Sequence, residues 1–161
     1  MPQICPITIT PLSADTVEAV AALEKACFTT PWSPKALREE LDNPMAVFFT
    51  AQIDGQVAGY AGMHHVVDEG YIANIAVDAA YRRMGVASAL LEAFFSYART
   101  HALTLLTLEV RAGNTAAQQL YQKYGFVENG RRRDYYRHPT EDALLLCRTF
   151  TPDSAENNNQ V

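Results

Sequence analysis

Hydrophobic positions along the chain follow two spacings, and the changes between them mark the expected elements. Apolar residues recur at helical spacing over residues 13–27, 33–43, 87–98 and 114–124. Runs typical of strands lie at 4–12, 46–53, 57–67, 71–77, 105–110, 126–130 and 143–150. This interleaved order predicts one α/β domain, with a mixed, mostly antiparallel central sheet flanked by about four helices.

Short polar signals indicate where several of these elements begin and end. Ser13 is expected to cap the first helix, and Ser33, followed by a proline, the second. Asp-Gly at 54–55, between two strand-like runs, predicts a tight hairpin. Asn114 is expected to cap the last helix, and Gly125 to end it.

Composition predicts the limits of the domain and the location of the protein in the cell. We expect residues 1–150 to form the domain and the polar, asparagine-rich segment 151–161 to be a disordered tail. No apolar run approaches the roughly 20 residues of a membrane-spanning helix. The first residues lack the basic and apolar regions of a secretory signal, so a cytoplasmic location without membrane contact is expected.

Charge and cysteine content narrow the choice of partners. The net charge of −5 does not favour nucleic acid, although an acidic surface suits a basic partner. Arg131–Arg133 is the one basic run, and it is more typical of a solvated strand or of phosphate contacts. The 3 cysteines are widely spaced, which argues against a disulfide framework and against a metal site. Cys27 and Cys147 are expected to pack as small hydrophobic residues.

The segment Tyr81–Ser88, between a strand and a strong helix, is the most informative candidate binding site. Gly85 and Ala87 leave the backbone uncovered, and successive N–H groups at a helix start can bind a pyrophosphate. Neither a P-loop nor a dinucleotide-binding glycine pattern is present. The pattern formed by Arg82, Gly85 and Ala87 is weak alone, since an ordinary loop-to-helix junction would look similar.

Further sequence stretches, taken together with this turn, support one interpretation of it. They are Phe28–Ser33, Asn74–Asp78, Leu108–Asn114, Leu120–Tyr121 through Gly125–Phe126, and Tyr135–Tyr136 with Glu141–Ala143. Together with the turn they resemble the GNAT family of acetyltransferases over residues 4–150. The resemblance is greater to members that acetylate the N-terminal alanine of a small-subunit ribosomal protein. The chain departs from the pattern at Gly113, where serine is common, and at Arg137–His138, which lengthen a loop.

The resemblance implies acetyl-coenzyme A as acetyl donor and no metal. Backbone groups of Ile75, Ala76 and Val77 would then bind the pantetheine arm and the acetyl carbonyl. The pyrophosphate would lie on the turn formed by Arg82, Arg83, Met84, Gly85, Val86, Ala87 and Ser88. Asn114 would contact the coenzyme in addition to capping its helix.

Two residues are candidates for the chemistry. Glu109 interrupts an apolar strand, where a carboxylate is costly unless it is paired or catalytic. An ion pair with Arg111 or another arginine is one interpretation; the resemblance implies a general base. Tyr121 could be a core aromatic, and the resemblance implies that it protonates the departing thiolate. The expected mechanism is direct attack of a free amine within a ternary complex.

The acceptor is expected to be the α-amine of a basic N-terminal segment that begins with alanine. Tyr135 and Tyr136 could line the slot for its first residue, and Asp68 and Glu69 could attract its positive charge. A small-molecule amine, another protein N-terminus or a lysine is an alternative acceptor within the same fold. A non-catalytic module that only binds acyl-coenzyme A is an alternative from a different class.

Overall fold

The computed structural model describes residues 6–151 and contains seven strands and four α-helices within that range. In chain order the elements are β1 (Thr8–Pro11), α1 (Val17–Cys27), α2 (Pro34–Leu41), β2 (Ala46–Ile53), β3 (Gln56–Val66), β4 (Glu69–Val77), the 3-10 helix η1 (Ala79–Tyr81), α3 (Val86–Thr100), β5 (Leu105–Arg111), α4 (Thr115–Lys123), β6 (Val127–Tyr136) and β7 (Glu141–Thr149). The strands follow the order β1-β2-β3-β4-β5-β7-β6. β4 and β5 are parallel, whereas β1–β2, β2–β3, β5–β7 and β6–β7 are antiparallel. The mixed, mostly antiparallel sheet is therefore confirmed.

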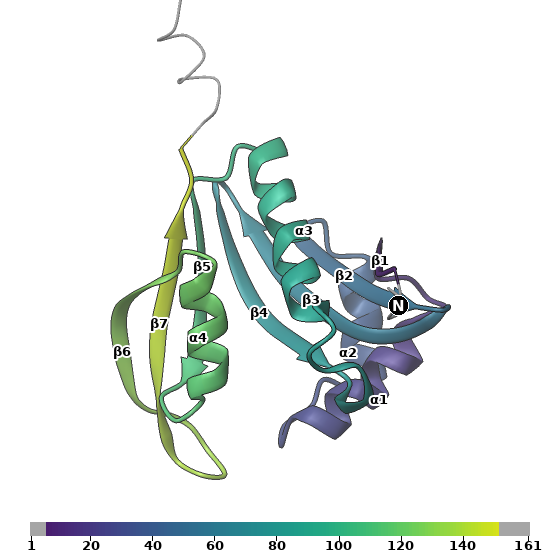
Figure 1. Cartoon of the computed structure of the whole chain (residues 1–161), viewed down its shortest axis with the longest axis horizontal. Coiled ribbons are helices and arrows are strands. Elements are labelled where there is room, and N and C mark those ends of the chain that lie inside the picture. Colours follow the sequence, from purple (N-terminus) through teal and green to yellow (C-terminus); the bar gives the residue numbers. More distant parts are fainter. Residues whose placement is uncertain (1–5, 152–161) are drawn as a thin grey trace, which may run out of the picture. The chain divides into compact units, whose positions relative to one another are not determined.

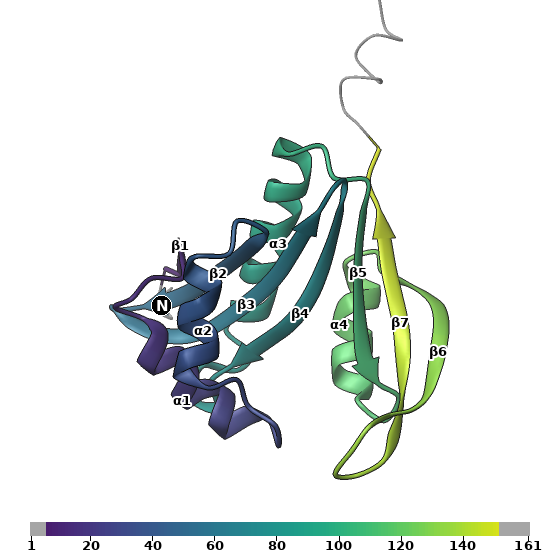
Figure 2. The same ribbon diagram turned by 180° about the vertical axis from the view of Figure 1, so that it is seen from behind.

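The chain clusters into two compact units, here called unit 1 (residues 1–64 and 74–97) and unit 2 (residues 65–73 and 98–161). Unit 1 carries α1 and α2 on one face of β2 and β3, and α3 on the other (Figures 1 and 2). Successive side chains of β2 point to opposite faces of the sheet, as they do in any strand. Phe49 packs on Phe94 of α3 with ring centroids 5.8 Å apart. Phe48 belongs to the core cluster under α1 and α2.

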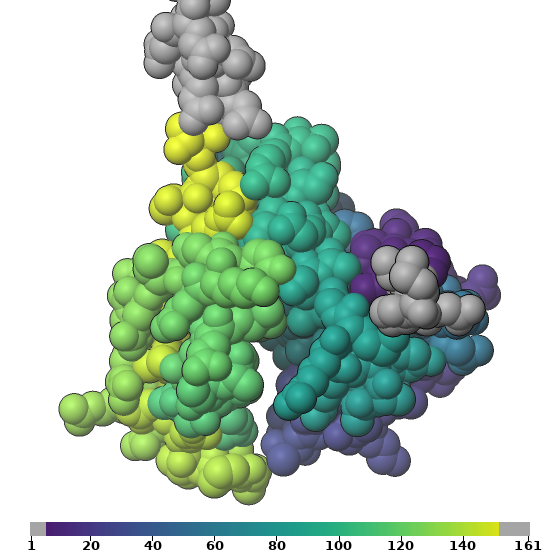
Figure 3. Space-filling model, viewed as in Figure 1, coloured from purple at the N-terminus to yellow at the C-terminus, as the bar shows by residue number. Residues whose placement is uncertain are grey.

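Unit 2 is built on β5, β7 and β6, with α4 on one face (Figures 1 and 2). β5 alternates strictly: Leu106, Leu108 and Val110 are buried, and the residues between them are half-buried. β7 lies between β5 and β6, and in Figure 3 atoms of α4 and β6 hide most of it. β5 thus has one buried apolar face and one half-buried face, which carries Thr107 and Glu109.

Most of the expected boundary signals are confirmed. The Ser33 hydroxyl accepts a hydrogen bond from the Ala36 N–H at 3.1 Å, and Asn114 caps α4 through the Ala117 N–H at 3.1 Å. Asp54 and Gly55 both have positive φ, as a two-residue hairpin turn requires.

Two expectations about boundaries are wrong. Ser13 does not cap α1, which begins at Val17 with Thr16 at the cap position; the Ser13 N–H instead donates to the Thr16 hydroxyl at 3.0 Å, closing a separate turn. β6 continues to Tyr136, well beyond the expected end at 130. As the last strand in the sheet order, β6 can carry charged residues along its length, and these obscured the strand pattern.

Some predictions concern residues outside the described range. The tail at 152–161, Cys5 and the first residues of the expected strand 4–12 fall there. Of the free cysteines in the described range, Cys27 and Cys147 are both partly buried. No helix within residues 6–151 is long and apolar enough to cross a membrane. Over the same range no three histidine, cysteine, aspartate or glutamate side chains are grouped so that they could hold a metal ion.

Candidate active site

Glu109 lies on the polar face of β5 in unit 2. Its side chain is only 11% exposed, and its Oε1 lies 3.5 Å from Nε of Arg132 on β6. The second oxygen, Oε2, is buried and makes no hydrogen bond to any described residue. The expected ion pair therefore exists, but with Arg132 and not with Arg111. Because the pair occupies one oxygen, the other keeps lone pairs with which it could accept a proton.

Two tyrosines adjoin this carboxylate. Hydrogen bonding to Glu109, then burial, raises the pKa of Tyr135. Burial, followed by the charge of Glu109, raises the pKa of Tyr71 on β4. Tyr71 is 38% exposed and Tyr135 46% exposed, so both rings also face solvent. An incoming group that reached Glu109 would meet these two rings.

An irregularity in β6 explains how Arg132 and Tyr135 approach the same carboxylate. In a regular strand, residues three apart point to opposite faces. Arg132 pairs with Ala143 and Tyr136 with Glu141, so four steps along β6 match two steps along β7. The extra residues form a bulge with Asp134 at φ 50°. Such bulges re-aim side chains, and this one brings Tyr135 to the face that carries Arg132.

Tyr136 interacts electrostatically with both Glu109 and Tyr121. Its pKa is raised to about 12 by burial and by the charge of Glu109. Tyr121 is buried in α4, and burial, then its proximity to Tyr136, raises its own pKa. The Tyr121 ring also packs edge-on against Phe126, with centroids 5.6 Å apart. Tyr121 consequently keeps its proton across the neutral range, as a hydrogen-bond donor must.

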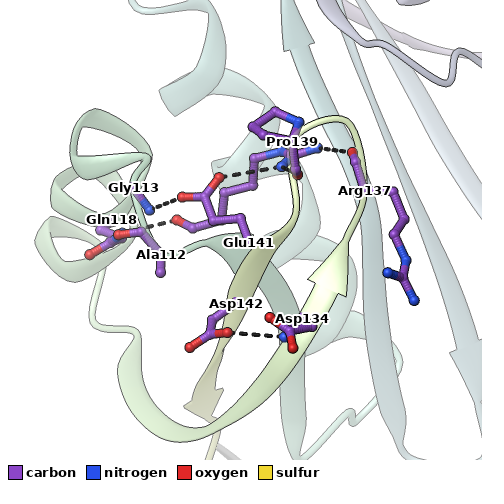
Figure 4. Close-up of polar contacts among 9 residues, drawn as sticks. Ala112, Gly113, Gln118, Asp134, Arg137, Pro139, Glu141 and Asp142 are labelled. Carbon is purple, nitrogen blue, oxygen red and sulfur yellow. Dashed lines mark hydrogen bonds and ion pairs between the residues drawn. The ribbon is translucent and has the colours of Figure 1, made fainter.

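Arg111 holds the loop that follows the two tyrosines. Its guanidinium donates to the Arg137 carbonyl at 3.2 Å and the Pro139 carbonyl at 3.1 Å, and it lies 4.4 Å from the centroid of the Tyr136 ring. It also pairs with Glu141, whose carboxylate accepts from the Gly113 N–H (Figure 4). The loop lengthened by Arg137–His138 is thus tied to the end of β5, next to Glu109.

A second set of contacts fixes the bulge itself. The Asp134 N–H donates to the Asp142 carboxylate at 3.0 Å, as Figure 4 shows, and Arg131 pairs with the same carboxylate at 3.2 Å. The hydrogen bond from Asp134, and then Arg131, lowers the pKa of Asp142. The carboxylate therefore remains charged at neutral pH, and it holds the bulge in the conformation that presents Tyr135.

The expected anion-binding turn lies in unit 1, between η1 and α3. Arg83 and Gly85 both have positive φ, at 65° and 85°. The first helical bond runs from the Ala89 N–H to the Gly85 carbonyl at 2.9 Å. The preceding amides, at Val86 to Ser88, have no carbonyl one turn earlier to bind. A Cβ placed on Gly85 would meet no atom within 4 Å, so the backbone there is open to a ligand.

Replacing Gly85 tests this turn. Gly85→Val should weaken coenzyme A binding by about tenfold or more, because a β-branched residue disfavours the positive φ and covers the amides. Isothermal titration with coenzyme A measures the change. Gly55→Val is the matched control, since Gly55 also has positive φ and open surroundings but lies in the β2–β3 hairpin. Unchanged affinity in Gly85→Val would remove the turn from the binding site.

Not every residue expected in the site lies near Glu109. Asp68 accepts hydrogen bonds from the Thr104 N–H at 2.7 Å and the Thr104 hydroxyl at 3.1 Å, and therefore secures the start of β5. Glu69 pairs with Leu105, four residues before Glu109. That separation is about 13 Å along a strand. Glu69 therefore lies away from Glu109 itself, although it is only two residues from Tyr71 on β4. A role of Asp68 and Glu69 in attracting a basic peptide stays a prediction.

Tyr71 and Arg132 are site residues that the sequence did not single out. Tyr71 reaches Glu109 because β4 pairs with β5 in parallel, with Ile72 opposite Leu108. A parallel register between two strands separated by a helix leaves no local sequence signal. Arg132 belonged to a basic run in which no member was distinguishable before the bulge was known.

Comparison with known proteins identifies relatives that are similar in sequence over most of the chain. Residues 17–126 match the family model described as Acetyltransferase (GNAT) family. The [Ribosomal protein bS18]-alanine N-acetyltransferase of Escherichia coli strain K12 is 36% identical over 144 residues, which cover 87% of this chain and 95% of the relative. The N-alpha-acetyltransferase RimI of Mycobacterium tuberculosis is 35% identical over 149 residues, covering 89% of this chain and 92% of the relative.

A solved structure agrees with these relatives. The crystal structure of the ribosomal-protein-S18-alanine N-acetyltransferase from Escherichia coli superimposes with a TM-score of 0.84 at 33% identity. The alignment covers 91% of this chain and 95% of that one.

Proposed function

The chain belongs to the GNAT family of acetyltransferases, and on that premise we propose that it acetylates the α-amine of an N-terminal alanine on a small-subunit ribosomal protein. Acetyl-coenzyme A, the donor used by the family, supplies the acetyl group. The bS18 protein named for the relatives is the candidate acceptor. The observation that carries the proposal is Glu109, whose buried Oε2 has no hydrogen-bond partner among the described residues and which adjoins two solvent-facing tyrosines.

Glu109 acts as the general base. An attacking amine must lose a proton as its nitrogen bonds to the acetyl carbon. Oε2 is available to take this proton, while Oε1 stays with Arg132. The attacking nitrogen must therefore approach Oε2, on the side of the carboxylate that Arg132 does not occupy.

Tyr121 assists the departing sulfur. As the carbon–sulfur bond breaks, negative charge builds on the sulfur, and a donor aimed at it is strengthened in the transition state. Because burial raises the pKa of Tyr121, complete proton transfer to a thiolate with a pKa of roughly 8.5 is unfavourable. The main contribution of the phenol is accordingly a hydrogen bond to the sulfur.

The donor is held by backbone groups. The turn from Arg82 to Ser88 takes the pyrophosphate on its amides and the adjacent helix start. The end of β4, at Ile75, Ala76 and Val77, supplies N–H and C=O groups to the pantetheine arm and the acetyl carbonyl. Asn114, whose side chain caps α4, also contacts the coenzyme.

The acceptor is a basic segment with a small first residue. Tyr71 and Tyr135 flank Glu109 and form the aromatic walls against which the first side chain lies. Tyr136, fixed by Arg111, closes the same side. The chain carries a net charge of −5, which favours a cationic peptide over an acidic one.

A direct assay tests this function. A synthetic basic peptide that begins with alanine, incubated with acetyl-coenzyme A and the full chain, is expected to gain one acetyl group at its N-terminus. Release of the free thiol should follow peptide acetylation mole for mole. Transfer to polyamines at rates far above the peptide rate would identify a small-molecule enzyme instead. Coenzyme binding without transfer to any amine would indicate a binding module.

A further inference from the structure

Glu24, in α1 of unit 1, is a buried carboxyl group that the proposed chemistry does not use. It is 0% exposed, and Glu24 and Thr50 are the buried polar residues of the described range. Burial of a carboxyl is costly unless it is paired or hydrogen-bonded. An apolar residue at this inner position of α1 would avoid that cost, so the contacts of Glu24 need an explanation.

Glu24 joins α1 to β3 and β4. Its Oε1 accepts a hydrogen bond from the Tyr60 hydroxyl and another from Asn74 Nδ2 at 2.6 Å. Asn74 Nδ2 also lies 3.5 Å from the Tyr60 oxygen, so the three side chains form one cluster. Burial raises the pKa of Glu24, while the hydrogen bonds from Tyr60 and Asn74 oppose the rise.

Asn74 immediately precedes the β4 segment assigned to acetyl-coenzyme A, Ile75–Val77. The other end of that segment contacts the same helix turn, because the Cys27 thiol lies 3.8 Å from the Val77 carbonyl. Ala76, between them, packs in the core cluster that includes Leu23 of α1. The last turns of α1 thus contact β4 at both ends of the segment, and the residue between them belongs to the same core cluster as α1.

β3 limits movement of the same segment. A Cβ placed on Gly59 would lie 2.8 Å from the Ala76 carbonyl oxygen, so the two backbones are in close approach. The Asp78 N–H donates to the Ala58 carbonyl at 2.8 Å just beyond the segment. The backbone of Ile75–Val77 is therefore held between β3 and the contacts to α1.

We propose that Glu24 is a positioning residue for acetyl-coenzyme A: through Asn74 and Tyr60 it sets the backbone position of Ile75–Val77. The inference rests on the proposed use of acetyl-coenzyme A. Removing the Glu24 acceptor leaves the Asn74 amide and the Tyr60 hydroxyl without their buried partner, and the strand shifts to find new ones. Backbone groups that bind a ligand are sensitive to displacements of about 1 Å.

The test compares Glu24→Leu with Glu24→Gln. Glu24→Leu removes the acceptor and should raise Kd for coenzyme A, and KM for acetyl-coenzyme A, about tenfold, with KM for the peptide unchanged. Glu24→Gln keeps an acceptor oxygen and should bind within about twofold of wild type. Glu18→Leu is the matched control, because Glu18 lies exposed on the same helix in a surface pair with Arg38, and it should change neither constant.

The outcomes separate this inference from the function on which it rests. If wild type binds coenzyme A and a folded Glu24→Leu binds it equally well, the positioning role is wrong and the proposed function stands. Equal increases of both KM values would also overturn it, since they indicate general loosening. If Glu24→Leu does not fold, Asn74→Ala takes its place and should give the same tenfold loss. A wild-type chain that binds no coenzyme A would overturn both proposals.

Discussion

Glu109→Gln is expected to lower kcat by about two to four orders of magnitude, the usual contribution of a positioned general base. Glutamine preserves the shape of the side chain, and its amide oxygen can still accept from Arg132. What it lacks is a carboxylate that can take the amine proton. Binding of coenzyme A should remain within about twofold, because the contacts proposed for the coenzyme do not involve this side chain.

Glu128→Gln provides the comparison for this variant. Glu128 lies on β6 of the same unit, where its side chain is exposed, so the same change of charge should leave kcat unaltered. Steady-state rates at saturating concentrations of both substrates measure the difference. Retention of a tenth or more of wild-type kcat by Glu109→Gln would show that another group, or solvent, removes the proton.

A basic peptide with a free N-terminal alanine should be acetylated about two orders of magnitude faster than the same peptide blocked at its N-terminus. At pH 7.5 an α-amine with a pKa of about 7.7 to 8.0 is roughly one-third neutral, whereas a lysine near 10.4 is neutral about one time in a thousand. A single carboxylate that is already paired with Arg132 deprotonates the first more readily than the second.

The two peptides must carry the same lysines, so that only the terminus differs. Mass spectrometry after proteolysis then locates each acetyl group. Blocked and free peptides acetylated at equal rates would reassign the acceptor to lysine. A third peptide, with a bulky first residue in place of alanine, should react more slowly, since Tyr71 and Tyr135 flank the carboxylate.

The fold was largely predictable because its elements carry local signals. The hairpin at Asp54–Gly55 needs two residues with positive φ, and the sequence supplies a pair that tolerates it. Ser33 and Asn114 cap their helices by contacts within three residues. Ser13 shows the limit of such signals. Ser13 and Thr16 could each precede the first turn of α1, and in the structure Thr16 holds the cap position while Ser13 belongs to a separate turn.

In the candidate site, sequence reasoning could select single residues but not the neighbours that the fold brings to them. Glu109 stood out because a carboxylate in an apolar strand is unusual. Its true partner, Arg132, depends on a bulge that adds residues to β6 relative to β7, and no sequence pattern gives a register shift. Tyr71 depends likewise on the pairing of β4 with β5. The expectation that Asp68 and Glu69 attract the acceptor rests on their charge alone and stays a prediction.

Gly113 illustrates how these contacts restrict future change in the chain. A Cβ at this position would lie 2.5 Å from Oε2 of Glu141, so even alanine would shift the carboxylate that pairs with Arg111. Because Oε2 is the far end of a flexible side chain, the shift itself costs little. It would nevertheless weaken the pair with Arg111, which packs on the Tyr136 ring. We therefore expect substitutions at Gly113 and Glu141 to be epistatic, with the effect of one depending on the residue present at the other.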